Sequence, residues 1–270
     1  MGQFIWHIGD MEVNMQTVIL CGGKGTRMRE ETEYRPKPLV EIGEKPIIWH
    51  IMKIYSHYGF NDFILCVGYK GYMIKQYFME MCWRNNDFTL QTGDGGTIRY
   101  HTKDAENWSV TIVDTGLETL TGGRLKKIEK YIDGDEFMFT YGDGLSNVNI
   151  QELYKYHRTM NKSATLTGVH PISPFGVIEV KNDIVTSFKE KPILDDVVNG
   201  GYMVLNKKVF QHMPEEDCFF EHEPLRRLAA AEELAVYEHK GFWTAIDTYK
   251  DIERVNELWS TGGKPWKLWD

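Results

Sequence analysis

Residues 17–47 decide the fold and read TVILCGGKGTRMREETEYRPKPLVEIGEKPI. The first five residues of this stretch form a largely apolar run, which predicts a fully buried strand. Three glycines follow within four positions, and without a Cβ they let backbone N–H groups approach a ligand closely. Prolines on both sides of Lys37 then stiffen the backbone that carries this lysine. A buried strand, a glycine turn and nearby cations such as Arg27 indicate a receptacle for a polyphosphate.

The glycine turn matches neither of two common nucleotide-binding loops. No G-K-[ST] closes it as in a Walker A loop, and the third glycine of the dinucleotide fingerprint is missing. Taken alone, the turn is equally typical of an ordinary connection from a strand to a helix. The whole string, however, resembles the signature L-[AC]-G-G-x-G-T-R-L…K-P-[KM]-x-x-x-[IV] of the sugar-nucleotide pyrophosphorylases. These nucleotidylyltransferases join a nucleoside triphosphate to a sugar 1-phosphate.

Composition describes an ordinary globular chain. With 270 residues, 42% of them hydrophobic and 26% charged, it can bury one large core. We expect a single nucleotidyltransferase domain over residues 15–270, after an extension of residues 1–14 that lacks the pattern of a signal peptide. The net charge of −8 argues against a nucleic-acid partner, so anionic ligands must be held by local cations and backbone amides.

Cysteine usage and hydropathy favour a cytoplasmic protein. The four cysteines form no C-x-x-C pair, and a chain of this length does not need disulfides, so we expect reduced thiols. No apolar run approaches the 18 residues typical of a membrane-spanning helix, which predicts no membrane partner.

Hydrophobic periodicity alternates between strands and helices. A helix over 47–58, a buried strand over 63–67 and a helix over 69–83 follow the first strand. This rhythm predicts an α/β fold with a mostly parallel, doubly wound, Rossmann-like sheet and helices on both faces. Shorter alternating strands over 88–91, 98–102 and 109–114 indicate an edge or a small antiparallel excursion. Further strands are expected at 136–140, 164–169, 176–180, 184–188, 201–206 and 235–238, and further helices at 121–131, 148–160, 223–234 and 249–259.

Two aspartates follow predicted strands. Asp143 stands between two glycines after the strand 136–140, where ligands gather in open α/β sheets, although a lone Asp-Gly is usually a turn. Asp247 follows an apolar strand and has an alternative role as the N-cap of the helix at 249–259. The family resemblance implies that both carboxylates bind Mg²⁺, a cation that prefers oxygen ligands and keeps several waters or phosphate oxygens.

The resemblance also implies a set of substrate contacts. The predicted catalytic cations are Arg27, Lys37 and Lys191. The predicted nucleotide-binding residues are Leu20, Cys21, Gly22, Gly23, Lys24, Gly25, Thr26, Arg27, Thr121, Arg124 and Asp143. The predicted sugar-binding residues are Gly144, Glu190, Lys191, Asn199 and Gly200, drawn from the family's F-x-E-K-P and N-[AG]-G segments.

Three of these residues have plain structural alternatives. Lys191 reads equally as a surface lysine, and Asn199 as part of a β-turn before a strand. Arg124, in the first turn of a helix, is a candidate donor to N3 of cytosine, because arginine can only donate, but such arginines are often solvated.

Several strings resemble the glucose-1-phosphate cytidylyltransferases in particular, over the chain from Met15 to its last residue. They are WHIMKIYSHYG, GYKGYMIKQYF, WSVTIVDTG, TGGRLK, YGDG, FGVIEV, NGGYMVLN and PWKLW. This resemblance implies CTP and glucose 1-phosphate as substrates and a homo-oligomer, for which tryptophans near the chain ends are candidate interface residues. The same reaction with another base or phosphorylated substrate, and a non-catalytic nucleotide-sensing subunit, stay open as alternatives.

Overall fold

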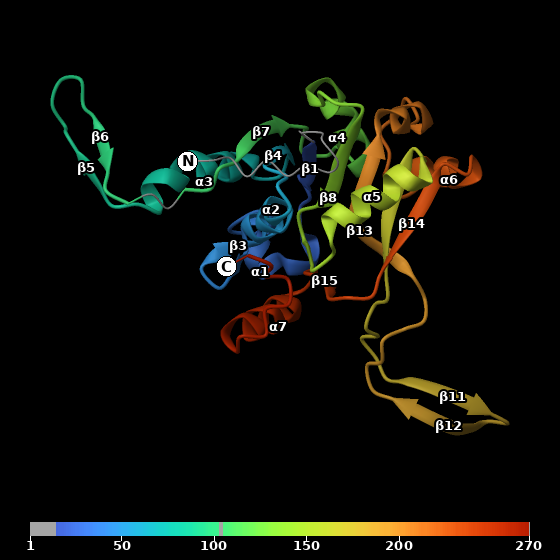
Figure 1. Ribbon diagram of the computed structural model, residues 1–270. Helices are drawn as coiled ribbons and strands as arrows, with labels where there is room; N and C mark the ends of the chain where they lie inside the picture. The colour runs from blue at the N-terminus through green and yellow to red at the C-terminus, as the bar shows by residue number, and fades with distance from the viewer. Residues whose placement is uncertain (1–14, 103–104, 270) are drawn as a thin grey trace.

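The computed structural model describes residues 15–102 and 105–269, and a seven-stranded sheet forms its centre (Figure 1). Six strands share one direction, and β13 runs antiparallel to both of its neighbours. The expected α/β class with a mostly parallel sheet is therefore confirmed. The strand order is β14 (Leu234–His239), β10 (Ala164–Val169), β13 (Val198–Asn206), β8 (Glu136–Tyr141), β1 (Gln16–Cys21), β4 (Asp62–Val67) and β7 (Ser109–Asp114).

The reversed direction of β13 has a consequence for the site. Residues 200–205 are all buried, so the sequence pattern of this strand would be the same for a parallel and for an antiparallel direction. Because β13 is antiparallel, its first residues lie beside the carboxyl ends of the neighbouring strands, with Asn199 opposite Gly168 near the end of β10. The sugar-contacting segment predicted from sequence thus reaches the edge of the sheet where ligands bind in such folds.

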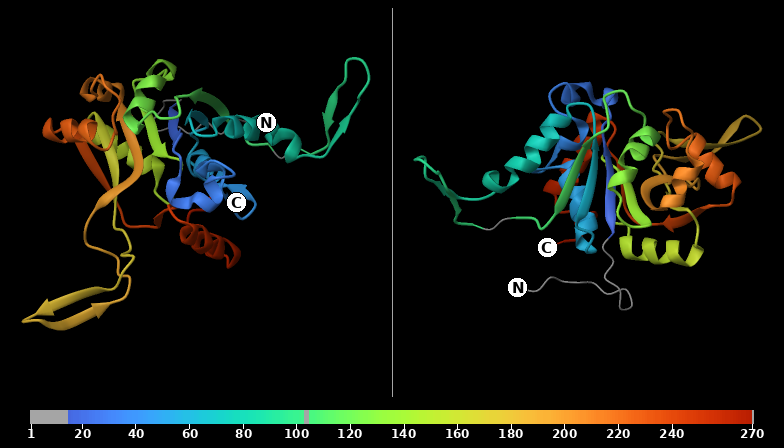
Figure 2. Two further views of the ribbon diagram at one scale, coloured as in Figure 1. Left: turned by 180° about the vertical axis from the view of Figure 1, so that it is seen from behind. Right: turned by 90° about the horizontal axis from the view of Figure 1, so that it is seen from above.

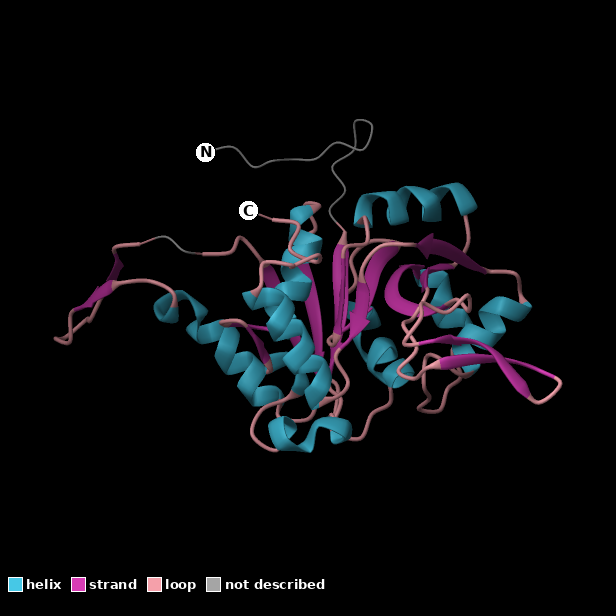
Figure 3. Cartoon of the chain, turned by 90° about the horizontal axis from the view of Figure 1, so that it is seen from below, coloured by secondary structure: helices cyan, strands magenta, loops and turns pink. Residues whose placement is uncertain are grey.

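Helices cover both faces of the sheet, as expected (Figures 2 and 3). Alternate residues of β1 enter separate apolar cores, with Ile19 and Cys21 on one face and Val18 and Leu20 on the other. This two-sided burial explains the unbroken apolar run of the strand. The first core includes residues of α2 (Ile47–His57), α3 (Gly71–Arg84), α5 (Ile150–Met160) and α7 (Tyr249–Ser260), and the second includes residues of α4 (Thr121–Ile128) and α6 (Glu223–Ala230).

Short elements complete the loops around the sheet. Two small antiparallel pairs join β2 (Glu41–Ile42) to β3 (Lys45–Pro46) and β9 (Gly144–Ser146) to β15 (Trp243–Ala245). The short helices are α1 (Arg29–Thr32), η1 (Thr26–Met28), η2 (Lys37–Leu39), η3 (Glu129–Tyr131) and η4 (Lys207–His212).

Two antiparallel hairpins project from the body as arms (Figure 1). The first consists of β5 (Phe88–Leu90) and β6 (Ile98–Tyr100), and the second of β11 (Val177–Lys181) and β12 (Ile184–Lys189). The sequence predicts the strands of both arms, and a small antiparallel excursion for the first. The strand at 109–114 is β7, which belongs to the main sheet as a parallel edge strand rather than to the excursion.

The tryptophans near the end of the chain pack inward. Trp266 is fully buried, and its indole N–H lies 3.4 Å from His50 Nδ1, while Trp259 and Trp269 pack around the same histidine. Trp266 is therefore not available to an interface, because it closes the core beside α2, whereas Trp259 and Trp269 are only partly buried and their role at an oligomer interface stays a prediction. Trp6 lies outside the described residues.

Two further expectations concern the whole chain. None of the helices within residues 15–102 and 105–269 is long and apolar enough to cross a membrane. All four cysteines are free thiols, as expected.

Candidate active site

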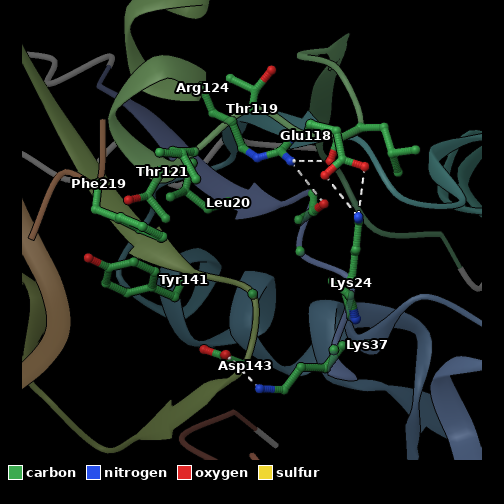
Figure 4. A pocket seen from close by; sticks show the side chains of 18 residues that line it. Leu20, Lys24, Lys37, Glu118, Thr119, Thr121, Arg124, Tyr141, Asp143 and Phe219 are labelled. Atoms are coloured by element: carbon green, nitrogen blue, oxygen red, sulfur yellow. Dashed lines mark hydrogen bonds and ion pairs between the residues drawn. The ribbon is translucent and has the colours of Figure 1, made fainter. Parts of the chain in front are cut away.

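A cavity of about 370 Å³ lies at the carboxyl ends of β1 and β8 (Figure 4). Parallel strands deliver their following loops to the same edge of the sheet, which is why residues far apart in sequence meet there. The lining residues are Leu20, Cys21, Gly22, Gly23, Lys24, Gly25, Lys37, Pro38, Leu117, Glu118, Thr119, Leu120, Thr121, Arg124, Tyr141, Gly142, Asp143 and Phe219. They include most of the residues that the sequence predicts for nucleotide binding.

Two positions of the turn require glycine. Gly25 has φ of 61°, in the left-handed region, and a Cβ there would lie 2.6 Å from Thr32 Cγ2. A Cβ on Gly22 would lie 2.1 Å from Arg124 Nη1, so only glycine lets the turn pack against this guanidinium. The glycines that indicated phosphate binding are therefore also needed to build the turn itself.

Arg124 holds the backbone beneath this turn. It is only 4% exposed, so the alternative of a solvated arginine is wrong. Nη2 donates to Gly22 O at 3.0 Å, and Nη1 donates to Thr115 Oγ1 at 2.6 Å and Gly116 O at 2.8 Å. These bonds connect the glycine turn after β1 with the loop after β7. Both terminal nitrogens are thus engaged by the protein, and contact with cytosine N3 stays a prediction.

Lys37 bridges the two aspartates that the sequence predicts as metal ligands. Its Nζ donates to Asp143 Oδ2 at 2.7 Å and to Asp247 Oδ1 at 2.8 Å, while Arg27 Nη1 donates to Asp247 Oδ2 at 3.1 Å. Burial by itself lowers the pKa of Lys37, but Asp143 and then Asp247 outweigh it, so the pKa is raised. Burial likewise acts to raise the pKa of Asp247, and Lys37 followed by Arg27 outweighs it, so that pKa is lowered. Four residues predicted to act on phosphates or metal therefore meet at one place.

The donor set fits a hard divalent cation. Asp143 and Asp247 direct one oxygen each at a single ammonium, which shows that both carboxylates converge on a point of cation size. Among the described residues, no group of three or more His, Cys, Asp or Glu side chains could hold a metal. A cation held by these two aspartates would therefore complete its shell with water or phosphate oxygens, as magnesium does in phosphate-transferring sites.

Asp247 does not cap helix α7. The N-cap is Thr248, whose side chain accepts from Asp251 N in a capping box. The alternative reading of Asp247 as an N-cap is therefore wrong, and its carboxylate is directed instead at Lys37 and Arg27.

The residues predicted to contact the sugar divide between two places. Lys191 is half-exposed and lines a second cavity of about 690 Å³, together with Ala245 and Thr248, which flank Asp247 in sequence. Glu190 lies next to it, with 4.0 Å between Lys191 Nζ and Glu190 Oε1.

The predicted N-G-G segment lies inside β13. Asn199 Oδ1 accepts from Gly201 N at 2.9 Å, and Gly200 O accepts from Trp243 Nε1 at 2.7 Å. The β-turn alternative for Asn199 is wrong, because the residue is part of the strand. Gly144 begins β9, directly after Asp143.

Sequence reasoning missed part of the pocket wall. Glu118 pairs with Lys24 at 2.7 Å, and Phe219 lines the cavity although it lies far from the glycine turn in the chain. Tyr141, which also lines the cavity, belongs to the YGDG segment that carries Asp143. The one available signal was the aromatic pair at 219–220, which reads equally well as core.

Comparison with known proteins agrees with this geometry. The family model described as nucleotidyl transferase matches residues 16–261. The chain is 49% identical over 256 residues to a probable glucose-1-phosphate cytidylyltransferase of Bacillus subtilis (strain 168), covering 94% of this chain and all of that protein. It is 46% identical over 258 residues to the glucose-1-phosphate cytidylyltransferase of Salmonella typhimurium, covering 95% of this chain and all of that protein. Among solved structures, HddC from Yersinia pseudotuberculosis superposes with a TM-score of 0.66 at 22% identity, over 91% of this chain and 99% of that one, which shows the shared fold.

Proposed function

The chain belongs to the nucleotidyl transferase family, and from this premise we propose that it joins CTP and glucose 1-phosphate to give CDP-glucose and pyrophosphate. The choice of substrates is supported by two relatives that match over their whole length and carry the name glucose-1-phosphate cytidylyltransferase. The observation that carries the reaction type is the contact of Lys37 with both Asp143 and Asp247 beside a glycine turn.

The chemistry needs little from the protein beyond positioning and charge. An oxygen of the sugar phosphate, already an anion, attacks the α-phosphorus in line and forms a new P–O bond. The bond between the α-phosphorus and its bridging oxygen breaks, and that oxygen leaves with pyrophosphate. No general base is needed to create the nucleophile, and no covalent enzyme intermediate forms, so catalysis consists of orientation and charge neutralisation.

Each charged residue has a proposed place in this reaction. Arg27 and the amides of the glycine turn hold the β- and γ-phosphates, and Lys37 contacts the α-phosphate. Lys191 holds the incoming sugar phosphate. Asp143 and Asp247 hold Mg²⁺, which when bound supplies positive charge to the triphosphate.

The sugar hydroxyls are assigned to a smaller set of groups. Glu190 accepts from hydroxyls, whereas the amide of Asn199 can both donate to them and accept from them. Gly144 and Gly200 offer backbone close to the same substrate. Small molecules are therefore the proposed partners of this site.

We further propose that residues 15–270 form one domain that assembles into a homo-oligomer. Because Trp266 is buried in the core, the support comes from the arm formed by β11 and β12. Ile178, Val180 and Ile184 on this arm are each more than half exposed, and such apolar area on a projecting hairpin favours association. A monomeric mass by light scattering at micromolar concentration would contradict this proposal.

A pyrophosphate-release assay tests the function. The full chain is offered each of four nucleoside triphosphates with several sugar 1-phosphates, with and without Mg²⁺. The highest kcat/KM is expected for CTP with glucose 1-phosphate. A preference for another pair would favour the same reaction with another base or sugar, and no activity with any pair would favour a nucleotide-sensing role.

A further inference from the structure

Residues 217–220 lie along one wall of the candidate active site, which Phe219 lines directly. Asp217 accepts from Leu120 N at 3.0 Å, and Cys218 O accepts from Gly122 N at 2.9 Å. These two bonds fasten the segment to the start of α4, where the nucleotide-binding Thr121 is predicted. The segment therefore belongs to the pocket although nearly 100 residues separate it from α4 in the chain.

Glu221 lies behind this wall and connects two residues that line the pocket. Thr121 Oγ1 donates to Glu221 Oε2 at 2.6 Å, and the hydroxyl of Tyr141 donates to Glu221 Oε1. Glu221 is not among the residues that line the cavity, whereas Thr121 and Tyr141 are. Its carboxylate thus contacts the lining of the pocket through these two hydroxyls.

The chemistry of a carboxylate fixes how both hydroxyls are oriented. An ionised carboxylate can only accept hydrogen bonds, so each hydroxyl directs its one proton at Glu221 and keeps only lone pairs for other partners. Thr121 Oγ1 uses one lone pair to accept from Phe220 N at 2.8 Å. What remains on the ligand side of each hydroxyl is an acceptor with a fixed direction.

Tyr141 extends this connection toward the sugar side. Its ring lies against Gly201 of β13, where a Cβ would be 2.8 Å from Tyr141 Cδ2, and Gly201 N donates to Asn199 Oδ1 at 2.9 Å. Asn199 is a predicted sugar contact, and Tyr141 precedes Gly142 and Asp143 in the chain. A single carboxylate therefore links the predicted nucleotide side, through Thr121, to the predicted sugar side, through Tyr141.

We propose that Glu221 is a positioning residue for the transfer reaction, orienting the hydroxyls of Thr121 and Tyr141 so that both substrate sides of the pocket are held in one arrangement. This inference rests on the proposed function, because it names the residue that organises the same site. Replacing the carboxylate by an amide of equal size places an N–H donor against one hydroxyl, which must then turn its proton away. The loss of the fixed hydroxyl orientation should therefore weaken the binding of both substrates.

The test is steady-state kinetics of the full chain with Glu221→Gln. We expect KM to rise roughly tenfold for CTP and for glucose 1-phosphate, as for a lost hydrogen bond to a charged group, with kcat much less affected. The matched control is Glu223→Gln, two residues further on, whose carboxylate pairs with Arg227 of the same helix at 2.9 Å. We expect the control to retain both KM values, and both variants to keep the far-UV circular dichroism of the parent.

Single substitutions of Thr121 and Tyr141, the two hydroxyl partners of Glu221, test whether Glu221 positions the pocket or only stabilises the fold. Thr121→Val is expected to raise KM for CTP, and Tyr141→Phe to raise KM for glucose 1-phosphate. Adding Glu221→Gln to Tyr141→Phe should raise KM for glucose 1-phosphate little further, because residues acting through one contact are not additive. These two variants also carry the test if Glu221→Gln does not fold.

Several results would overturn the inference. Unchanged KM values in Glu221→Gln would exclude the positioning role, as would a lower thermal midpoint with both KM values retained. If Glu221→Gln does not fold, unchanged KM values in both Thr121→Val and Tyr141→Phe would exclude it. Absence of turnover by the parent chain with CTP and glucose 1-phosphate would refute the proposed function and this inference together, whereas an active parent with an unaffected Glu221→Gln would refute the inference alone.

Discussion

Replacement of Lys37 by alanine removes the cation that lies between Asp143 and Asp247. Both carboxylate oxygens are within 2.8 Å of one nitrogen, so they are at most about 5.5 Å apart, and two unit charges at that distance repel by about 3 kcal/mol at an effective dielectric constant of about 20. The Asp143 and Asp247 side chains are 34% and 39% exposed, so solvent screening reduces this repulsion to about 1–2 kcal/mol. We expect the free energy of unfolding without added Mg²⁺ to fall by that amount.

The same substitution should have a larger effect on activity. Loss of one preorganised charge aimed at the reacting phosphate costs about 3–4 kcal/mol, or roughly two to three orders of magnitude in kcat/KM. Arginine should rescue poorly at this position, because its planar fork cannot replace a compact ammonium that contacts two carboxylates from one atom. The Lys37 side chain is only 13% exposed, which leaves little room for the larger group.

Two measurements check this prediction. Pyrophosphate release gives kcat/KM for the parent, Lys37→Ala and Lys37→Arg, and urea unfolding gives stability with and without MgCl₂. Lys45→Ala is the matched control, because its ammonium donates to Asn85 at 3.2 Å and lines neither cavity. Full activity of Lys37→Arg would show that charge alone matters, and an alanine variant as active and stable as the parent would refute the role of Lys37.

Three further predictions follow from the site and the core. Asp143→Asn should lower kcat by at least about a hundredfold with the fold retained, because it removes a proposed metal ligand; near-parental kcat at ordinary Mg²⁺ would contradict the metal role. Arg124→Ala should raise KM for CTP and narrow the preference for CTP over UTP. An equal fall in kcat/KM for CTP and UTP would assign Arg124 only to holding the backbone at Gly22. Burial lowers the pKa of His50 from 6.5 to about 4, so the stability gained from its neutral form is complete above pH 6.5 and is lost as the pH falls toward 4, by about 3 kcal/mol in all. Urea unfolding at pH 7 and pH 4.5 should show most of this loss of unfolding free energy in the parent and a smaller loss in His50→Gln. An equal loss of unfolding free energy between the two pH values in both proteins would exclude His50 as the cause.

Local patterns were enough for most of the architecture. The apolar run before Gly22 and the helical spacing of residues 47–58 are encoded within a few neighbouring residues, so the alternation of strands and helices could be predicted directly. The glycines around Asp143 likewise marked a strand end with a turn. Helix-capping chemistry was less certain, since Asp247 and Thr248 are both suitable caps, and only the structure assigns the cap to Thr248.

Tertiary structure decided what depends on contacts between distant segments. The bridge from Lys37 to Asp247 spans 210 positions, and the bond from Tyr141 to Glu221 spans 80. No local periodicity encodes such a pairing. A charged or hydroxyl residue has the same place in the sequence pattern whether its side chain is solvated or hydrogen-bonded to a distant residue. Arg124 shows the difference: its place near the pocket was predictable from its turn, but its burial against backbone carbonyls arises only where the loops after β1, β4 and β7 converge at one edge of the sheet.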